Sequence, residues 1–191
     1  MATLIRGREL GDWVARFNEV GIARTLMPPQ AIQGLVTSAG CVLASDLRRS
    51  RESARLLAPS RDIWIDPDLR EADLPSSMVV AFPLPVGMWI VIARVAWWLN
   101  WFSSRESIVA TRARAERVTT RLCAMADQHG TVAVIGHGMF NRFIATELSE
   151  RGWRGPKFLP SGHWTAARFT RSAVSTAVVM EDTRSLGLRG S

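Results

Sequence analysis

Hydrophobic positions along this chain of 191 residues follow two kinds of spacing. Apolar residues that recur every three or four positions predict helices at 8–19, 31–38, 46–57, 86–102, 104–128 and 139–151. Short, mostly apolar runs bounded by turn residues predict strands at 41–44, 63–65, 131–135, 164–169 and 173–179. Because helices alternate with short strands, we expect an α/β protein, built as a three-layer α/β/α sandwich with a mostly parallel central sheet.

No linker or repeat divides the sequence, so we expect a single domain over 1–180 and a flexible tail over 181–191. Cys41 and Cys123 lie inside apolar segments and are expected to be buried free thiols. Free thiols fit a reducing compartment, and we expect a cytoplasmic location. The basic residues near the N-terminus are not followed by the apolar segment of a signal peptide.

The net charge of +7 comes almost entirely from arginine, and Lys157 is the single lysine. An excess of arginine favours anionic partners such as phosphates, carboxylates, nucleic acid or an acidic lipid surface. The motifs described below favour a small phosphorylated ligand or inorganic phosphate among them. A general bias of composition toward arginine is the alternative explanation. The arginines are scattered and form no basic tail, so no nucleic acid is expected as a partner. The sequence contains no cluster of metal-ligand residues, and neither a metal nor another cofactor is expected.

The stretch 78–102 is unusually apolar, with Arg94 as its one charge and four of the eight tryptophans. Pro83 and Pro85 interrupt it and leave a helix over 86–102, shorter than the roughly 20 apolar residues of a membrane span. A charge near the middle of a span is also costly in lipid. A buried or lid helix beside the functional site is therefore favoured over a contact with the membrane surface, and that contact over a span.

Two segments share the order strand, sharp turn, polar residue, helix. They are 45–49, which ends in Arg49, and 136–138, in which glycines flank His137. In α/β sheets ligands bind at the carboxyl ends of strands, where helix N-termini suit a phosphate. Arg49 is therefore a candidate for gripping phosphate with two N–H groups, and His137 for a hydrogen bond to it. The alternatives are a solvated basic helix face for Arg49 and a core or capping role for His137.

Glu71 lies in the loop that follows the predicted strand 63–65. A carboxyl group beside a bound phosphate can protonate a leaving oxygen, which makes Glu71 a candidate general acid. An ordinary surface glutamate is the alternative interpretation.

Three segments together resemble the histidine phosphatase (phosphoglycerate mutase-like) superfamily. Residues 45–54 are similar to its segment S-P-L-x-R-A-x-Q-T-A, residues 69–71 to L-x-E, and residues 132–140 to V-x-V-V-x-H-G-G. The resemblance implies phosphomonoester hydrolysis through a phosphohistidine. It also implies that Arg49 binds the phosphate, that Glu71 donates the proton and that His137 hydrogen-bonds the phosphoryl group. No metal or other cofactor is implied.

The N-terminus departs from the family, which begins with a strand that ends in R-H-G and carries the phosphorylated histidine. Here the nearest match is residues 4–8, in which Arg6 can stand for the arginine and bind phosphate, but no histidine follows. Either the written chain starts too late and lacks the first strand, unless 3–6 supplies it, or the protein is a degenerate member. We expect phosphatase activity that is impaired or absent. The alternative is a non-catalytic protein that binds a phosphorylated ligand or a membrane surface.

Overall fold

The computed structural model describes residues 3–22, 27–75, 82–99, 101, 106–160, 162–171 and 176–182. The chain forms two compact units. The larger unit contains Gly21–Glu71 and Arg112–Ser185, and the smaller contains Met1–Val20, Ala72–Thr111 and Leu186–Ser191. The range 1–180, for which the sequence predicts one domain, contributes to both units.

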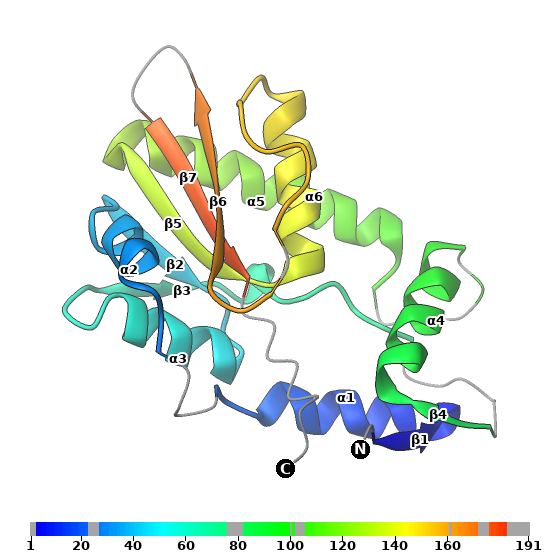
Figure 1. Ribbon diagram of the computed structural model, residues 1–191. Coiled ribbons are helices and arrows are strands. Elements are labelled where there is room, and N and C mark those ends of the chain that lie inside the picture. The colour runs from blue at the N-terminus through cyan, green and yellow to red at the C-terminus, as the bar shows by residue number, and fades with distance from the viewer. Residues whose placement is uncertain are drawn as a thin grey trace. The chain divides into compact units, whose positions relative to one another are not determined.

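The larger unit is built on a five-stranded sheet in the order β3-β2-β5-β7-β6 (Figure 1). Its strands are β2 (Cys41–Ala44), β3 (Ile63–Ile65), β5 (Thr131–Gly136), β6 (Thr165–Arg171) and β7 (Thr176–Asp182). Strands β3, β2, β5 and β7 run parallel, and β6 pairs antiparallel with β7. The sheet is therefore mostly parallel, as the sequence predicts.

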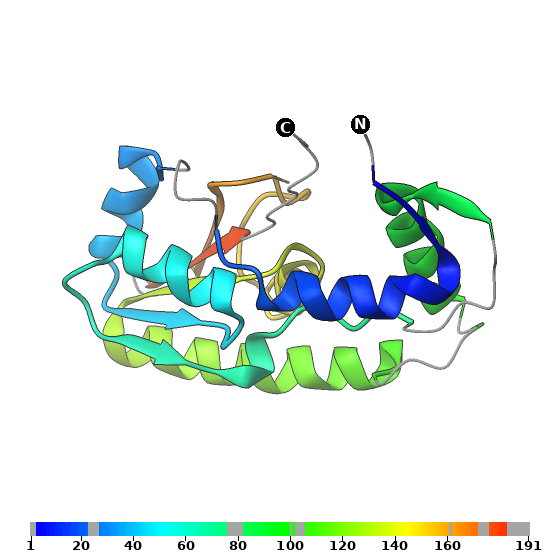
Figure 2. The same ribbon diagram turned by 90° about the horizontal axis from the view of Figure 1, so that it is seen from below.

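Helices cover both faces of this sheet. Helices α2 (Gln30–Thr37) and α3 (Arg48–Leu57) pack against one face, and α5 (Ile108–His129) and α6 (Gly138–Glu150) against the other. Alternate residues of β5 point to opposite sides, so that Ala133 and Ile135 join the α2–α3 core while Val132 and Val134 join the α5–α6 core. Figure 2 shows α3 and α5 on opposite sides of β2. The result is the three-layer α/β/α arrangement expected from the sequence.

The smaller unit contains β1 (Leu4–Arg6), a 3-10 turn (Gly7–Glu9), α1 (Leu10–Glu19), β4 (Pro83–Pro85) and α4 (Val86–Trp98). Strand β1 pairs antiparallel with β4, and its Ile5 lies opposite Leu84. The indole N–H of Trp89 donates to the carbonyl oxygen of Ile5 at 2.7 Å and ties α4 to β1. Segment 3–6 therefore supplies one strand of a two-stranded ribbon with β4, and it is not a strand of the five-stranded sheet.

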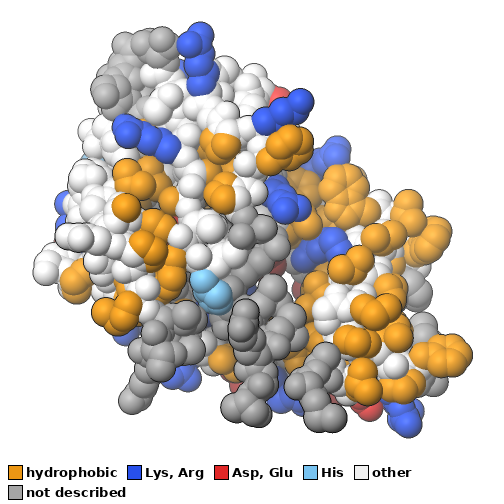
Figure 3. Space-filling view, in the orientation of Figure 1, with side chains coloured by type: hydrophobic (Ala, Val, Ile, Leu, Met, Phe, Trp, Pro, Cys, Tyr) orange, Lys and Arg blue, Asp and Glu red, His pale blue; other side chains and the backbone are white. Residues whose placement is uncertain are grey.

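Helix α4 is shorter than the predicted range 86–102, of which 100 and 102 fall outside the described residues. The guanidinium of Arg94 donates to the carbonyl oxygens of Ala72 and Asp73, at 3.3 and 3.2 Å, and lies over the ring of Trp97. One side of the helix is buried, and the other presents apolar side chains at the surface (Figure 3). Among the described helices, none has both the length and the apolar character needed to cross a membrane.

Some element boundaries differ from the prediction. Helix α3 begins at Arg48, not at residue 46, because Ser45 Oγ accepts the N–H of Leu47 within the preceding turn and Asp46 pairs with Arg70. Ser45 is therefore not the helix cap. Strand β4 was not predicted, since its two prolines disfavour a strand.

The structure describes only the first part of the predicted C-terminal tail. Of the range 181–191, Glu181 and Asp182 end strand β7, and 183–191 lie outside the described residues.

Both cysteines are free thiols. Cys41 is buried, and Cys123 is half-buried. Burial raises the pKa of both thiols, so each remains protonated at neutral pH.

The core of the larger unit yields a first prediction. Replacing Leu148, which is fully buried in α6, by alanine leaves a cavity and should lower the free energy of unfolding by about 2–5 kcal/mol. The matched control is Leu56→Ala in α3, where the leucine is 37% exposed; this change should cost less than about 1 kcal/mol. Urea unfolding followed by circular dichroism measures both, and equal losses would contradict the assigned core.

Candidate functional site

The carboxyl ends of β2 and β5 lie side by side. The two strands pair in parallel, with Ala44 opposite Ile135. The N–H of Ser45 then donates to the carbonyl oxygen of Ile135 at 3.1 Å, so the pairing continues into the first residue after β2. Because parallel strands end at the same edge, the residues that follow them are brought together there.

Arg49 and His137 meet at this edge. Arg49 is the second residue of α3, and His137 is the N-cap residue of α6. Arg49 Nη2 lies 3.4 Å from His137 Nδ1, and the two residues are only 4% and 1% exposed. A guanidinium can only donate, so in this contact Nδ1 is the acceptor, and the ring proton is inferred to be on Nε2 of a neutral imidazole. The sequence singled out both residues, and their roles as phosphate ligands stay predictions.

Helix α3 is anchored to β5 by the residue that follows Arg49. The hydroxyl of buried Ser50 donates to the carbonyl oxygen of Ile135 at 2.5 Å. This bond links the first turn of α3 directly to the strand that ends at His137. The position of Arg49 relative to His137 therefore depends on the sheet and not on a surface loop.

Glu71 caps helix α6. Its two carboxylate oxygens accept the backbone N–H groups of Met139 and Phe140, at 3.3 and 2.9 Å. These N–H groups belong to the first turn of the helix and have no partner within it, and a carboxylate there also complements the helix dipole. Glu71 thus lies at the helix that begins beside His137, and its role as proton donor stays a prediction.

The loop that carries Glu71 is held from two directions. Arg114 on α5 donates to the carbonyl oxygens of Asp68 and Arg70, at 2.5 and 2.9 Å. The guanidinium of Arg70 pairs with the carboxylate of Asp46 through two N–H groups, at 2.7 and 2.5 Å. This pairing raises the pKa of Arg70, whose side chain is largely exposed while that of Asp46 is not. The turn after β2 and the loop of Glu71 are therefore connected.

Two buried polar residues at this edge, Asn141 and Glu181, were not predicted from the sequence. Asn141 donates through its side-chain amide to the carbonyl oxygen of Glu181, at 3.0 Å, and its backbone N–H donates to the carbonyl oxygen of His137, at 2.8 Å. A Cβ at Gly136 would lie 2.5 Å from Asn141 Oδ1, so any side chain at this position would displace the buried amide of Asn141. A polar residue four positions after His137, on the same helix face, is the signal that could have identified Asn141.

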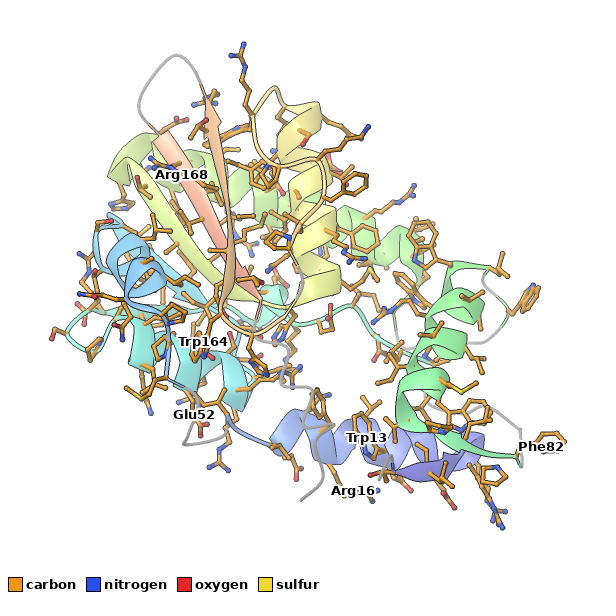
Figure 4. All side chains as sticks on the ribbon, viewed as in Figure 1. Trp13, Arg16, Glu52, Phe82, Trp164 and Arg168 are labelled. Carbon is orange, nitrogen blue, oxygen red and sulfur yellow. The ribbon has the colours of Figure 1, made fainter. Side chains whose placement is uncertain are left out.

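His163 belongs to the same edge by strand register. Gly136 lies opposite Asp182, and Asp182 lies opposite Thr165, so the start of β6 is level with the end of β5. Burial lowers the pKa of His163, which is therefore neutral at pH 7. The next residue, Trp164, packs toward the α2–α3 face of the sheet (Figure 4). No role was predicted for His163, because no motif surrounds it in the sequence.

Arg6 belongs to the smaller unit, whereas Arg49, Glu71 and His137 belong to the larger one. Arg6 ends β1 in the smaller unit, its side chain is exposed, and its backbone N–H donates to the carboxylate of Glu9 at 2.9 Å. Its role as a phosphate ligand stays a prediction. Within the described part of the chain, no group of three or more His, Cys, Asp or Glu side chains could hold a metal ion.

Solved structures with similar folds are phosphatases by name. The mycobacterial glucosyl-3-phosphoglycerate phosphatase in complex with VO3 is 18% identical with a TM-score of 0.49, and the match covers 95% of this chain and 96% of that chain. Its native structure matches with a TM-score of 0.47, and covers 81% and 85%. A candidate α-ribazole-5′-P phosphatase from Escherichia coli is also 18% identical, with a TM-score of 0.48 and coverage of 98% and 95%. No curated protein sequence matches this chain.

A sequence model of one family covers most of the chain. The model of the histidine phosphatase superfamily (branch 1) matches residues 15–175. This range contains Arg49, Glu71 and His137 and begins after Arg6. Since the match extends over far more than half of the sequence, the protein belongs to the histidine phosphatase superfamily.

Proposed function

We propose that this protein binds the phosphate group of a small phosphomonoester, or inorganic phosphate, at the carboxyl edge of β2 and β5. The observation that carries the proposal is the buried contact between Arg49 and His137. Membership of the histidine phosphatase superfamily supports a phosphatase-type function for the same edge. The nature of the group attached to the phosphate is left open.

Arg49 supplies the charge for this binding. A guanidinium remains protonated in proteins and presents two parallel N–H groups that match two oxygens of a phosphate. Because the Arg49 guanidinium is buried, where the local dielectric constant is low, its attraction for an anion is stronger than it would be in water. His137 supplies a second donor once its Nδ1 takes up a proton, which a bound dianion beside the ring favours.

Binding must break the hydrogen bond between the two side chains. Arg49 Nη2 donates to His137 Nδ1 across 3.4 Å, so in this arrangement that N–H is occupied and the ring nitrogen that faces it carries no proton to donate to a phosphate oxygen. The arrangement therefore represents the ligand-free state, and the ligand replaces the Arg49–His137 contact by two charge-assisted hydrogen bonds.

Glu71 is proposed as the proton donor to the leaving oxygen. The N–H groups of Met139 and Phe140 already bind its carboxylate, so they do not bind the phosphate in this state. Recognition of the ligand then depends on the side chains of Arg49 and His137. Proton donation requires the carboxylate to take up a proton from solvent and to turn from the helix end toward the ligand.

Turnover in this chain is proposed to be slow. Covalent catalysis in the family needs an imidazole in line behind the phosphorus atom. The first histidine of these 191 residues is His129, so the segment that forms β1 and the turn after it contains none. Losing the nucleophile removes the step that divides one difficult displacement into two easier ones. This observation also favours the second candidate function, binding of a phosphorylated ligand without hydrolysis.

The binding proposal predicts the effect of removing Arg49. Arg49→Ala should weaken the binding of inorganic phosphate by about 10- to 100-fold, because hydrogen bonds from a charged donor contribute about 1.5–3 kcal/mol. Arg49→Lys keeps the charge but loses the two-pronged geometry, and an intermediate affinity is expected. Isothermal titration calorimetry measures the dissociation constants, and circular dichroism checks that each variant is folded.

The matched control is Arg51→Ala, which removes an exposed arginine from the same helix. Because solvent screens the charge of Arg51, its removal should change the affinity for phosphate by no more than about threefold. Equal losses for Arg49→Ala and Arg51→Ala would mean that the net charge attracts phosphate without a defined site, and the proposal would fail.

The turnover proposal predicts weak hydrolysis of p-nitrophenyl phosphate. The rate should be far below the usual enzyme range of about 1 per second or more. A rate within that range, abolished both by His137→Asn and by Arg49→Ala, would contradict the expectation. It would show that another group in this chain acts as the nucleophile.

A further inference from the structure

Helix α4 exposes an apolar face that the functions above do not use. The face is formed by six side chains that are each between 36% and 62% exposed. They are Met88, Val91, Ile92, Val95, Trp98 and Leu99. The opposite side of the helix is buried in the core of the smaller unit through Val86, Trp89 and Ala93. Helix α4 is thus apolar on both sides, although only one side is covered within the unit.

The spacing along this α4 face is that of a helix–helix contact. Met88, Val91, Val95 and Trp98 are separated by three, four and three positions, which is the spacing of the a and d positions of a heptad. Ile92 and Leu99, which are seven residues apart, lie next to this row of four side chains. Together the six residues form an apolar stripe as wide as that of a helix packed against a partner. Figure 3 shows hydrophobic side chains gathered over α4.

The area of the α4 face matches one side of a dimer interface. The exposed parts of its side chains, together with Trp101 just beyond the helix, amount to roughly 500 Å² of apolar surface, from typical side-chain areas. A standard interface buries about 800 Å² on each partner, and about 65% of it is apolar in homodimers, which is again about 500 Å². The face alone therefore supplies the apolar part of such an interface.

The charges of α4 favour a protein partner over a lipid surface. Helices that lie in a membrane interface carry a polar face rich in lysine and arginine. Helix α4 has a single charged residue, Arg94, and its guanidinium is bound to the carbonyl oxygens of Ala72 and Asp73 and lies over Trp97. The helix itself therefore presents no row of cations for anionic headgroups beside its apolar face.

We propose that the α4 face binds the α4 face of a second copy of this chain across a two-fold axis. An antiparallel pairing places Val91 of one copy against Val95 of the other, and Met88 against Trp98. The small valines then lie at the centre and the large side chains at the ends, and each face is complementary to itself. Antiparallel helices also place opposite dipole ends beside each other.

Sedimentation velocity of the full chain over a range of concentrations tests this proposal. The unmodified protein should be a dimer, and Val91→Glu should raise its dissociation constant by more than about a hundredfold, because each copy then buries an unpaired carboxylate against the apolar Val95 of the other. The matched control is Val109→Glu, which places the same charge at a valine 73% exposed on α5 and should leave the dimer intact. Circular dichroism confirms that both variants are folded.

Two outcomes would overturn the proposal. One is an unmodified protein that sediments as a monomer at every concentration, and the other is a dimer that Val91→Glu does not weaken. Co-sedimentation with vesicles of phosphatidylcholine and phosphatidylglycerol separates the lipid explanation. A monomer that binds these vesicles, and that loses the binding in Val91→Glu but not in Val109→Glu, would assign the α4 face to the membrane surface.

Discussion

The parallel pairing of β2 with β5 is the constraint on which the candidate site depends. It makes two chain segments separated by about ninety residues end at one edge, and each segment starts a helix there. The hydroxyl of Ser50 then fixes the first turn of α3 to β5, while Glu71 fixes the first turn of α6. The side chains of Arg49 and His137 are thereby held by the sheet and by two anchored helix ends.

Burial gives this edge its electrostatic character. Arg49 stays protonated even where water is excluded, so the larger unit keeps a positive charge that can attract an anion strongly. The carboxylate of Glu71, at the start of α6, is occupied with backbone N–H groups. The site is thus suited to a phosphate through side-chain donors, which differs from a site built on free helix N-termini.

Much of this arrangement could be predicted from local sequence, and the exceptions have physical causes. The buried strands were located because they are continuous apolar runs, whereas Pro83–Pro85 became a strand only by pairing with β1. Asp46 was predicted as the first residue of the helix, but its carboxylate pairs with a distant arginine, and the hydroxyl of Ser45 accepts an N–H within the turn before α3. The capping role of Glu71 and the burial of Glu181 depend on contacts between segments far apart in sequence. A one-dimensional pattern contains no information about such contacts.

The central claim is that phosphate binds between Arg49 and His137, and nitrogen NMR of the histidine rings tests it most directly. The chain has only three imidazoles, those of His129, His137 and His163, so their signals can be assigned by single substitutions. Without phosphate, His137 should be neutral with an unprotonated Nδ1. Saturating phosphate should shift this nitrogen toward the protonated form and leave His129, at the opposite end of β5, unchanged. A His137 signal that stays constant while phosphate binds, or equal shifts in all three rings, would contradict the account.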